Sequence, residues 1–336
     1  MTVAGEMQRL LIAKLSSLGD IVHALPSLCA LRRSFPTGRI CWLVGPKGWQ
    51  TVAGHPDLDR AYVVGVEGQD SERVRFVPTY PKAVGALRRE RFDVALDLQG
   101  LLKSAVPCFL SGARLRVGLE GAREGARFLY TRVAADSGKD QHAVRRCLAA
   151  AYWLGAEPGL VEFRLRADEE ARAWAEQFLG ERVRHGNLVA LAPGSSRPDK
   201  CWPVEGFARL AVALTTAGAT VVTVGSAGEK QLEQALVAAS AVEFLRAAGA
   251  TTVAQLIALL ERCVLFVGND SGPLHIAAAL GVPCLAFYGP TSPRLTGPYG
   301  DQHVVLTPPG ETGDIGLISF AQAEAACLRL LGKARP

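Results

Sequence analysis

The chain has 336 residues, of which 49% are hydrophobic and 21% are charged, and its formal net charge is +5. This balance excludes a disordered or fibrous chain and predicts a globular protein long enough for two domains. The positive charge is too small and diffuse to indicate nucleic-acid binding, whereas it suits anionic small molecules or an anionic membrane surface.

The first half of the chain reads as strands alternating with helices. Strands are expected at residues 9–15, 39–44, 61–64, 92–98 and 115–118, and helices at 21–34, 82–91, from 101 onward and at 142–154. This alternation is typical of a parallel sheet that is covered by helices on both faces.

The second half repeats the pattern after a helical stretch at 164–184 and a boundary at Arg184-His185-Gly186-Asn187. Strands are expected at 188–192, 220–224, near Phe244, at 263–267 and 284–288, with helices at 205–217, 229–240, 252–261, 273–280 and 320–331. We therefore expect an α/β protein with two doubly wound Rossmann-like domains that face each other across a ligand cleft. The first domain would span residues 1–168 and the second 185–318, and packing of the final segment 319–336 against the first domain stays open.

The eight cysteines and the hydropathy indicate the compartment. None of the cysteines lies in a C-x-x-C pair and most lie inside apolar runs, which predicts buried, reduced thiols and no structural zinc. The N-terminus does not read as a signal peptide, and no window reaches the roughly 18 to 20 apolar residues that a membrane span needs. We expect a cytoplasmic protein.

The first loop with chemical potential is Ser16-Ser17-Leu18-Gly19-Asp20, between a strand and a helix. Asp20 stands at the helix start, so it is either a capping carboxylate or a general base held over the cleft. His23, one turn later, is either a helper in that site or a half-buried helix residue, and the second interpretation is favoured.

The second loop runs from Pro193 to Pro203 and carries Ser195, Ser196 and Lys200. Hydroxyl groups, backbone N–H groups and an ammonium in one short stretch suit a diphosphate. The spacing is not that of a Walker loop. The alternative is an ordinary polar loop with a surface lysine.

The third loop gives the strongest signal, because a buried strand ends in Gly-Asn-Asp and Ser-Gly-Pro opens an Ala-rich helix. Pro273 fits the first turn of that helix, where a missing N–H costs nothing. The N–H groups of Ser271, Gly272 and Leu274 can then face an anion, and the helix dipole favours negative charge there. Asp270 alone would read as a cap, but the whole constellation is hard to explain by capping.

Other signals are discounted. Asp57-Leu58-Asp59 matches the D-x-D pattern of metal-dependent sugar transferases, but it lies in a turn that enters a strand, so turn chemistry explains it better. No cluster of His or Cys has metal-ligand spacing, and neither G-x-G-x-x-G after the first strand nor G-x-S-x-G is present. The sequence therefore predicts no bound metal.

Five motifs in register resemble the ADP-heptose:lipopolysaccharide heptosyltransferase family, whose fold is the two-domain GT-B arrangement. The resemblance extends from Arg9 to about Gly300, and within the family it is closest to heptosyltransferase I. That branch is favoured by residues 97–104 and 141–145. The motifs are Lys14-Leu15-Ser16-Ser17-Leu18-Gly19-Asp20, Asp97-Leu98-Gln99-Gly100-Leu101-Leu102-Lys103-Ser104, Lys200-x-Trp202-Pro203, Asp270-Ser271-Gly272-Pro273-Leu274-His275 and Tyr288-Gly289-Pro290-Thr291.

The resemblance implies a role for each matching residue. Asp20 would be the catalytic base, and Lys200 would support departure of ADP. Arg123 would contact the acidic Kdo acceptor, with Arg73, Arg75 and Lys82 adding to that patch. The donor ADP-heptose would be held at the diphosphate by Ser195, Ser196 and Lys200, at the ribose by Glu229, and at the heptose and phosphates by the loop of Asp270, Ser271, Gly272, Pro273, Leu274 and His275.

The function implied is inverting, metal-independent transfer of L-glycero-D-manno-heptose from ADP-heptose to Kdo of lipid A. It needs no cofactor and no nucleic acid, and it places the enzyme at the cytoplasmic face of the inner membrane, with peripheral contact through basic residues of the first domain. Three alternatives stay open: heptosyltransferase II or III acting on a heptosylated acceptor, a nucleotide-sugar 2-epimerase of the same architecture, and a non-catalytic binding module.

Overall fold

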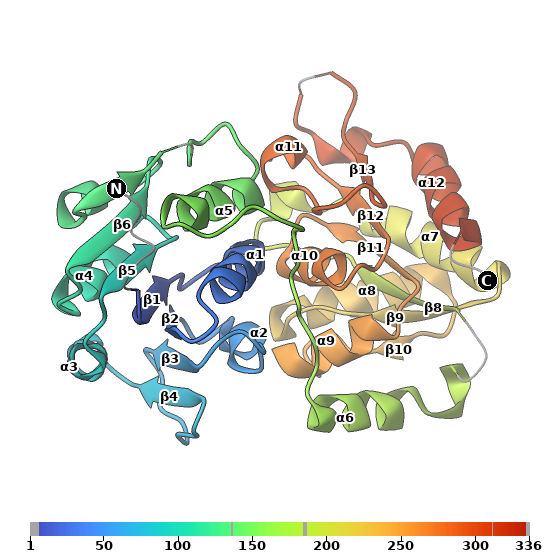
Figure 1. The fold of residues 1–336 in the computed structure, drawn as a ribbon. Coiled ribbons are helices and arrows are strands. Elements are labelled where there is room, and N and C mark those ends of the chain that lie inside the picture. The colour runs from blue at the N-terminus through green and yellow to red at the C-terminus, as the bar shows by residue number, and fades with distance from the viewer. Residues whose placement is uncertain (1–6, 136, 184–186, 311, 334–336) are drawn as a thin grey trace. The chain divides into compact units, whose positions relative to one another are not determined.

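The computed structural model describes residues 7–135, 137–183, 187–310 and 312–333. The chain divides into two compact units, residues 1–165 and 166–336, and each contains one parallel sheet with helices on both faces (Figure 1). The boundary expected at 184–186 lies outside the described residues. Among those that are described, no helix has both the length and the apolar run that crossing a bilayer requires.

The first unit is built on a seven-stranded sheet in which every pairing is parallel. The strand order is β4-β3-β2-β1-β5-β6-β7. Strands β2, β3 and β4 therefore lie in turn on one side of β1, and β5, β6 and β7 lie in turn on its other side. The strands are β1 Arg9–Ala13, β2 Arg39–Val44, β3 Arg60–Val64, β4 Val74–Val77, β5 Val94–Asp97, β6 Leu115–Leu119 and β7 Arg132–Ala134.

Helices cover both faces of this sheet. Helices α1 (Leu18–Ser34) and α5 (Ala143–Trp153) pack together on one face, and α3 (Tyr80–Glu90) and α4 (Leu102–Leu110) on the other (Figure 1). The short α2 (Trp49–Ala53) contacts α1 and β3, and a 3₁₀ turn, η2 (Ala126–Leu129), contacts α4. Fully buried apolar strand residues such as Leu11, Leu43 and Ala95 explain the continuous hydrophobic runs of the sequence.

The second unit repeats the plan with a six-stranded parallel sheet of order β10-β9-β8-β11-β12-β13. Its strands are β8 Asn187–Ala192, β9 Ala219–Thr223, β10 Leu245–Arg246, β11 Leu265–Asn269, β12 Cys284–Phe287 and β13 Val304–Leu306. Its helices are α6 Glu169–Leu179, α7 Val204–Thr216, α8 Lys230–Ser240, α9 Val253–Glu261, α10 Gly272–Ala279, α11 Pro293–Thr296 and α12 Phe320–Lys333, with 3₁₀ turns at Gly180–Val183, Pro198–Lys200, Ala227–Glu229 and Ile315–Leu317.

The final helix packs within the second unit. Ala323, Cys327 and Leu330 of α12 are buried in the same core as Phe207 and Leu210 of α7. Helix α12 also contacts β12. Its apolar stripe is therefore covered by its own unit in the described part of the chain.

The helix expected over 164–184 is wrong at its beginning. The structure has α6 only from Glu169 to Leu179, with Asp168 as an N-cap that accepts from the N–H of Ala171 at 2.8 Å. Before it, Arg164 has a left-handed φ of 47° and pairs with Asp57 at 2.9 Å. The tertiary ion pair between Arg164 and Asp57 thus overrides the helical composition of residues 164–168.

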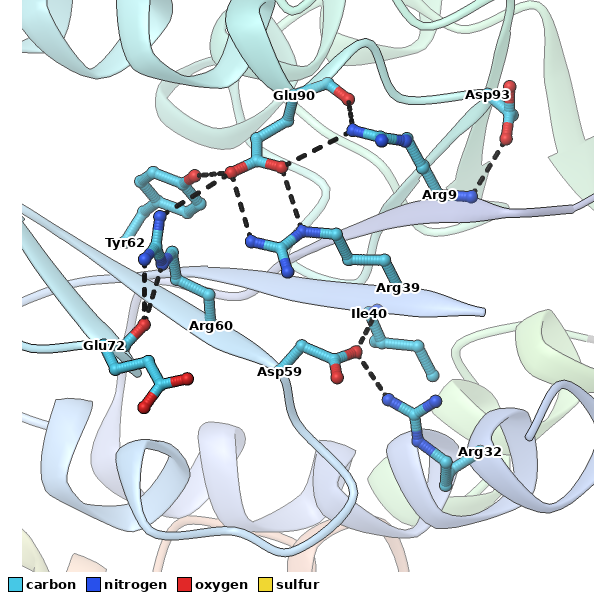
Figure 2. A network of polar contacts seen from close by, with 10 residues as sticks. All are labelled: Arg9, Arg32, Arg39, Ile40, Asp59, Arg60, Tyr62, Glu72, Glu90 and Asp93. Atoms are coloured by element: carbon cyan, nitrogen blue, oxygen red, sulfur yellow. Dashed lines mark hydrogen bonds and ion pairs between the residues drawn. The ribbon is translucent and has the colours of Figure 1, made fainter. Parts of the chain in front are cut away.

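An ion network ties the amino ends of three strands in the first unit (Figure 2). Arg9, Arg39 and Arg60 are the first residues of β1, β2 and β3, and all three guanidinium groups approach the carboxylate of Glu90 at the end of α3, the Arg39 group at 3.0 Å. The hydroxyl of Tyr62 donates to the same carboxylate. Burial raises the pKa of Glu90, but the hydrogen bonds from Arg39 and Tyr62 outweigh it and hold this pKa below its ordinary value.

The two carboxylates of the D-x-D pattern are both used in the structure of the turn. Asp59 accepts from the N–H of Ile40 and from Arg32, each at 2.6 Å (Figure 2). Asp57 is buried and pairs with Arg164. The interpretation as turn chemistry therefore fits the contacts of both residues.

Replacing Glu90 with glutamine tests the network. Because the pKa of Glu90 is depressed in the folded state, its contribution is present above the unfolded pKa of about 4.3 and is lost as the pH falls through the folded pKa. We expect Glu90→Gln to lower the free energy of unfolding by about 1 to 2 kcal/mol near pH 7, since solvent screens part of the ion-pair energy. Urea denaturation should show this difference shrinking toward pH 3.

Glu72→Gln is the matched control, because Glu72 gives Arg60 only its backbone carbonyl and its own side chain is exposed. Equal destabilisation by the two substitutions would contradict the role assigned to the Glu90 carboxylate.

Candidate active site

The strand order places the predicted loops at one point in each sheet. In the first unit the order reverses between β1 and β5, and in the second between β8 and β11. Parallel sheets bind ligands at the carboxyl ends of the strands beside such a reversal. The loops at 14–20 and 98–101 follow β1 and β5, and those at 193–200 and 270–272 follow β8 and β11. The loops after β1 and β5 are thus neighbours in the first unit, and those after β8 and β11 in the second.

Asp20 lies in the first turn of α1, but it is not the N-cap. Ser17 is the N-cap, and Asp20 reaches back to accept from its N–H at 3.0 Å and from its hydroxyl at 2.9 Å, both through Oδ2. The Ser16–Ser17 peptide bond is cis. The Asp20 side chain remains 43% exposed, so a substrate can reach it. Capping and a catalytic role are compatible here, and the assignment as base stays a prediction.

Two lysines stand beside this loop. Lys14 is buried, and its Nζ donates to the carbonyl of Leu98 at 2.8 Å and lies 4.0 Å from Oδ1 of Asp20. Lys103 donates to the hydroxyl of Ser16 at 2.8 Å. Lys14 and Lys103 both belong to motifs of the resemblance, but no local pattern indicates that Lys14 is buried beside the Asp20 carboxylate.

The β5 loop is bonded directly to the β1 loop. Oε1 of Gln99 accepts from the N–H groups of Leu15 and Ser16, each at 3.1 Å. Gln99 is itself held by Asp97, which is fully buried. Burial raises the pKa of Asp97, and hydrogen bonds that it accepts oppose this rise; the donors are the N–H groups of Gln99 and Gly100 and the hydroxyls of Ser104 and Tyr130.

The predicted acceptor residues differ in their surroundings. The Arg123 side chain is exposed, and its N–H donates to the carbonyl of Gly100, so it stands on the same edge as the Gln99 loop. Arg73 donates to the carbonyls of His55 and Leu58, so its guanidinium is engaged in that turn. His23 is buried in α1.

In the second unit Asp270 is the centre of the site. Its Oδ2 accepts from Nζ of Lys200 at 2.6 Å and from the hydroxyl of Thr291 at 2.8 Å, and its Oδ1 lies 3.5 Å from Nε2 of His275. Its carbonyl accepts from the hydroxyl of Ser195 at 2.7 Å. Burial raises the pKa of Asp270, but the hydrogen bonds from His275, Lys200 and Thr291 outweigh it and hold this pKa well below its usual range.

Asn269 connects the two loops of this unit in the way that Gln99 does in the first. Its Nδ2 donates to the carbonyl of Pro193 at 2.7 Å, and its Oδ1 accepts from the N–H of Trp202 at 3.0 Å. Neither Asn269 nor Thr291 was assigned a role from the sequence. Asn269 directly precedes Asp270, and Thr291 ends the Tyr288–Thr291 motif, so both lie in or next to segments that the sequence singles out.

The helix after Asp270 begins as expected. Ser271 is its N-cap, Gly272 is its first residue and Pro273 lies in its first turn. The buried hydroxyl oxygen of Ser271 has no hydrogen-bond partner among the described residues. Leu274 is fully buried, so its side chain belongs to the core and only its backbone can take part in a site.

Glu229 stands against the β8 loop. Its carboxylate accepts from the N–H of Ser226 in a capping box. A Cβ added to Gly194 would fall 2.0 Å from Oε1 of Glu229, so a larger residue at position 194 would push the Glu229 carboxylate aside. Ser196, by contrast, is exposed on the outer part of the same loop.

Folding also brings together Cys29, His55 and Asp57, whose ligand atoms lie within 4.8 Å of one another. Sequence spacing does not reveal this group. Nδ1 of His55 accepts from the N–H of Asp57, and Nε2 lies 2.9 Å from the carbonyl of Phe163, which can only accept, so Nε2 carries the proton. Both ring nitrogens therefore bond to the chain itself, and the absence of a bound metal stays a prediction.

The Asp270 cluster can be tested by its pH dependence. Because its folded pKa is depressed, the stabilisation is present above the unfolded pKa of about 3.9 and is lost as the pH falls through the folded value. Asp270→Asn should lower the free energy of unfolding by about 2 to 3 kcal/mol near pH 7, because the largely buried Lys200 loses its counter-charge. In urea denaturation, Asp199→Asn, which alters only an exposed pair with Arg197, should leave stability nearly unchanged; a larger loss for Asp199→Asn would refute this ranking.

Known proteins of one family resemble this chain. The sequence model of glycosyltransferase family 9 (heptosyltransferase) matches residues 82–312 of this chain. Lipopolysaccharide heptosyltransferase 1 of Pseudomonas aeruginosa is 30% identical over 310 residues, which cover 89% of this chain and 83% of that protein.

Two solved structures share the fold. A glycosyl transferase family 9 protein from Veillonella parvula has a TM-score of 0.85 at 24% identity, with 99% of both chains covered. ADP-heptose lps heptosyltransferase II of E. coli has a TM-score of 0.80 at 24% identity, covering 97% of this chain and 99% of that one. The expected GT-B fold of two Rossmann-like domains is confirmed. The chain belongs to glycosyltransferase family 9 (heptosyltransferase) and is a glycosyltransferase.

Proposed function

We propose that this enzyme transfers L-glycero-D-manno-heptose from ADP-heptose to Kdo of lipid A, in assembly of the lipopolysaccharide core at the cytoplasmic face of the inner membrane. The observation that carries the proposal is the cluster of Lys200, His275 and Thr291 around Asp270 at the start of α10. The names of the relatives, lipopolysaccharide heptosyltransferases 1 and II, support the substrate class. The segments 97–104 and 141–145 favour Kdo over a heptosylated acceptor.

The second unit supplies the donor site. Ser195, Ser196 and Lys200 hold the diphosphate together with the N–H groups at the start of α10, where the helix dipole favours negative charge. The unpartnered hydroxyl of Ser271 supports this placement, because a buried polar group usually has a hydrogen-bond partner and a bound diphosphate would supply one. Glu229 holds the ribose, and Asp270 with His275 orients Lys200 and the heptose.

The first unit supplies the acceptor site. Asp20 is the general base, and Lys14 and Lys103 add positive charge on the same edge. The exposed guanidinium of Arg123 binds the Kdo carboxylate. A carboxylate base and a cationic acceptor clamp on one sheet edge suit an acidic sugar.

The reaction is a single displacement. A hydroxyl of Kdo attacks the anomeric carbon from the face opposite ADP and gives its proton to Asp20, while the bond to the diphosphate oxygen breaks and ADP leaves with the electron pair. Lys200 and the start of α10 stabilise the charge that develops on ADP. The anomeric configuration is inverted, and neither a metal nor an organic cofactor is required.

The donor half is tested by a glycine substitution. Gly194→Ala places a methyl group against the Glu229 carboxylate and should weaken ADP binding at least tenfold, because the ribose contact is displaced. Isothermal calorimetry with ADP measures the change. Gly228→Ala is the control, since its Cβ would lie 3.8 Å from the Ser226 hydroxyl, an ordinary contact. Equal ADP affinity in Gly194→Ala and the wild type would remove Glu229 from the donor site.

The reaction is tested by ADP release from ADP-heptose with Kdo-lipid A, in excess EDTA. Wild type should turn over, and Asp20→Asn should lower kcat by about 10² or more, the usual value of general-base catalysis. Asp301→Asn, at an exposed turn, is the control and should keep full activity.

Other outcomes identify the alternatives. Turnover only on an acceptor that already carries heptose would identify the enzyme as a heptosyltransferase II or III. Conversion of the nucleotide sugar without an acceptor would indicate an epimerase, and ADP binding without turnover a binding module. Activity that EDTA abolishes and magnesium restores would disprove metal independence.

A further inference from the structure

Helix α4 carries its large apolar side chains on the outside. Leu102, Val106, Phe109 and Leu110 are all exposed, and their spacing places them on one face of the helix. The opposite face, which packs on the sheet, has the small residues Ala105 and Cys108. An amphipathic surface helix normally buries its large apolar residues. The exposed apolar face of α4 is therefore expected to contact another molecule or a membrane.

The 3₁₀ turn η2 extends this surface. Phe128 in η2 is 90% exposed, and η2 contacts α4. The guanidinium of Arg116 lies 5.1 Å from the centre of the Phe109 ring, which is itself 45% exposed. We call the surface formed by Leu102, Val106, Phe109, Leu110 and Phe128 the α4–η2 face. Figure 1 shows α4 on the side of the sheet away from α1 and α5.

The charge around this face is mainly positive. The segment 102–132 has two carboxylates, Glu120 and Glu124, and that of Glu124 already accepts from the N–H of Leu102. A face with exposed aromatic and aliphatic side chains and a cationic border complements the headgroup region of an anionic bilayer. A second copy of the chain would bring equal charges together, which disfavours self-association. Residues 102–132 contain six basic side chains against these two carboxylates: Lys103, Arg114, Arg116, Arg123, Arg127 and Arg132.

The face begins at the loops of the candidate acceptor site. Lys103 at the start of α4 bonds to Ser16, and the loop of Arg123 bonds to Gly100. The face and Asp20 therefore belong to one continuous region of the first unit. A sugar acceptor anchored by lipid needs a membrane-facing surface beside its site.

We infer that the α4–η2 face docks this enzyme on an anionic lipid surface, with Phe109 and Phe128 inserted at the headgroup boundary and Arg114 and Arg127 bound to lipid phosphates. The orientation toward the acceptor rests on the proposed function, whereas the lipid contact itself does not.

The test is sedimentation of the full chain with vesicles of phosphatidylethanolamine and phosphatidylglycerol, without any sugar. Wild type should bind, and high salt or vesicles of phosphatidylcholine alone should weaken binding. Phe109→Ser combined with Phe128→Ser should lower the partition coefficient at least tenfold, because the apolar contribution is lost. Arg114→Gln combined with Arg127→Gln should lower it about tenfold and flatten its salt dependence.

The control is Leu160→Ser, which removes an 83% exposed leucine of the same unit outside the face and should leave binding unchanged. The single variant Phe128→Ser changes a side chain that is 90% exposed, so it should bind vesicles more weakly without unfolding the protein. Thermal melting compares the stability of the single and double variants with that of wild type. Undiminished vesicle binding by the phenylalanine variants would overturn the inference. So would a wild-type dimer in analytical ultracentrifugation that these variants dissociate.

An activity assay separates this inference from the proposed function. With a deacylated, water-soluble Kdo acceptor, the double phenylalanine variant should match wild type, whereas with acceptor embedded in vesicles its rate should fall at least tenfold. Equal rates on embedded acceptor would overturn the docking role. Vesicle binding that responds to the variants as described, with no turnover of either acceptor, would support docking and contradict the proposed function.

Discussion

The arrangement of the loops at the candidate site depends on one constraint: in each sheet, the carboxyl ends of two particular strands are neighbours. At the reversal of strand order, the carboxyl ends of β1 and β5 meet in the first unit and those of β8 and β11 in the second. In both units an amide side chain at the carboxyl end of the second strand bonds to the backbone of the loop after the first: Gln99, just after β5, to residues 15 and 16, and Asn269, the last residue of β11, to Pro193 and Trp202. In each unit one amide side chain thus makes two hydrogen bonds to a loop that lies 67 to 84 residues away in the chain.

The two edges of the first sheet have different tasks. At the amino ends of β1, β2 and β3, three arginines form ion pairs with the carboxylate of Glu90. The carboxyl edge keeps exposed polar groups, among them the carboxylate of Asp20 and the guanidinium of Arg123. The Glu90 network and the proposed site therefore lie at opposite ends of the same strands, and substitutions at one end need not disturb the other.

Much of the fold follows from local pattern. Buried hydrophobic runs located most strands within two residues, and the polar loops after β1, β8 and β11 were recognised because glycine, proline and hydroxyl residues cluster there. The short strands β4, β7 and β13 were missed because three or four partly exposed residues carry no clear period. The helical composition before Glu169 misled, since the pairing of Arg164 with Asp57 is a contact across 107 residues.

The same limit applies to the site. Asp270, Lys200 and Ser195 could be grouped from their motifs, but the burial of Lys14 and the bonds made by Asn269 depend on neighbours far away in the sequence. No local pattern encodes them. The trio of Cys29, His55 and Asp57 is a further case, because only folding brings Cys29 to the turn that contains the other two.

The distribution of thiols has a practical consequence for labelling. All eight cysteines are free, and seven are buried, with burial raising the pKa of each, to about 12 for Cys41. Cys201 is partly exposed, and it directly follows Lys200 in the loop after β8. Since thiolate access governs alkylation, a maleimide fluorophore reacts there first. The sequence therefore offers a single-site optical reporter beside Lys200, with no cysteine needing to be removed or introduced.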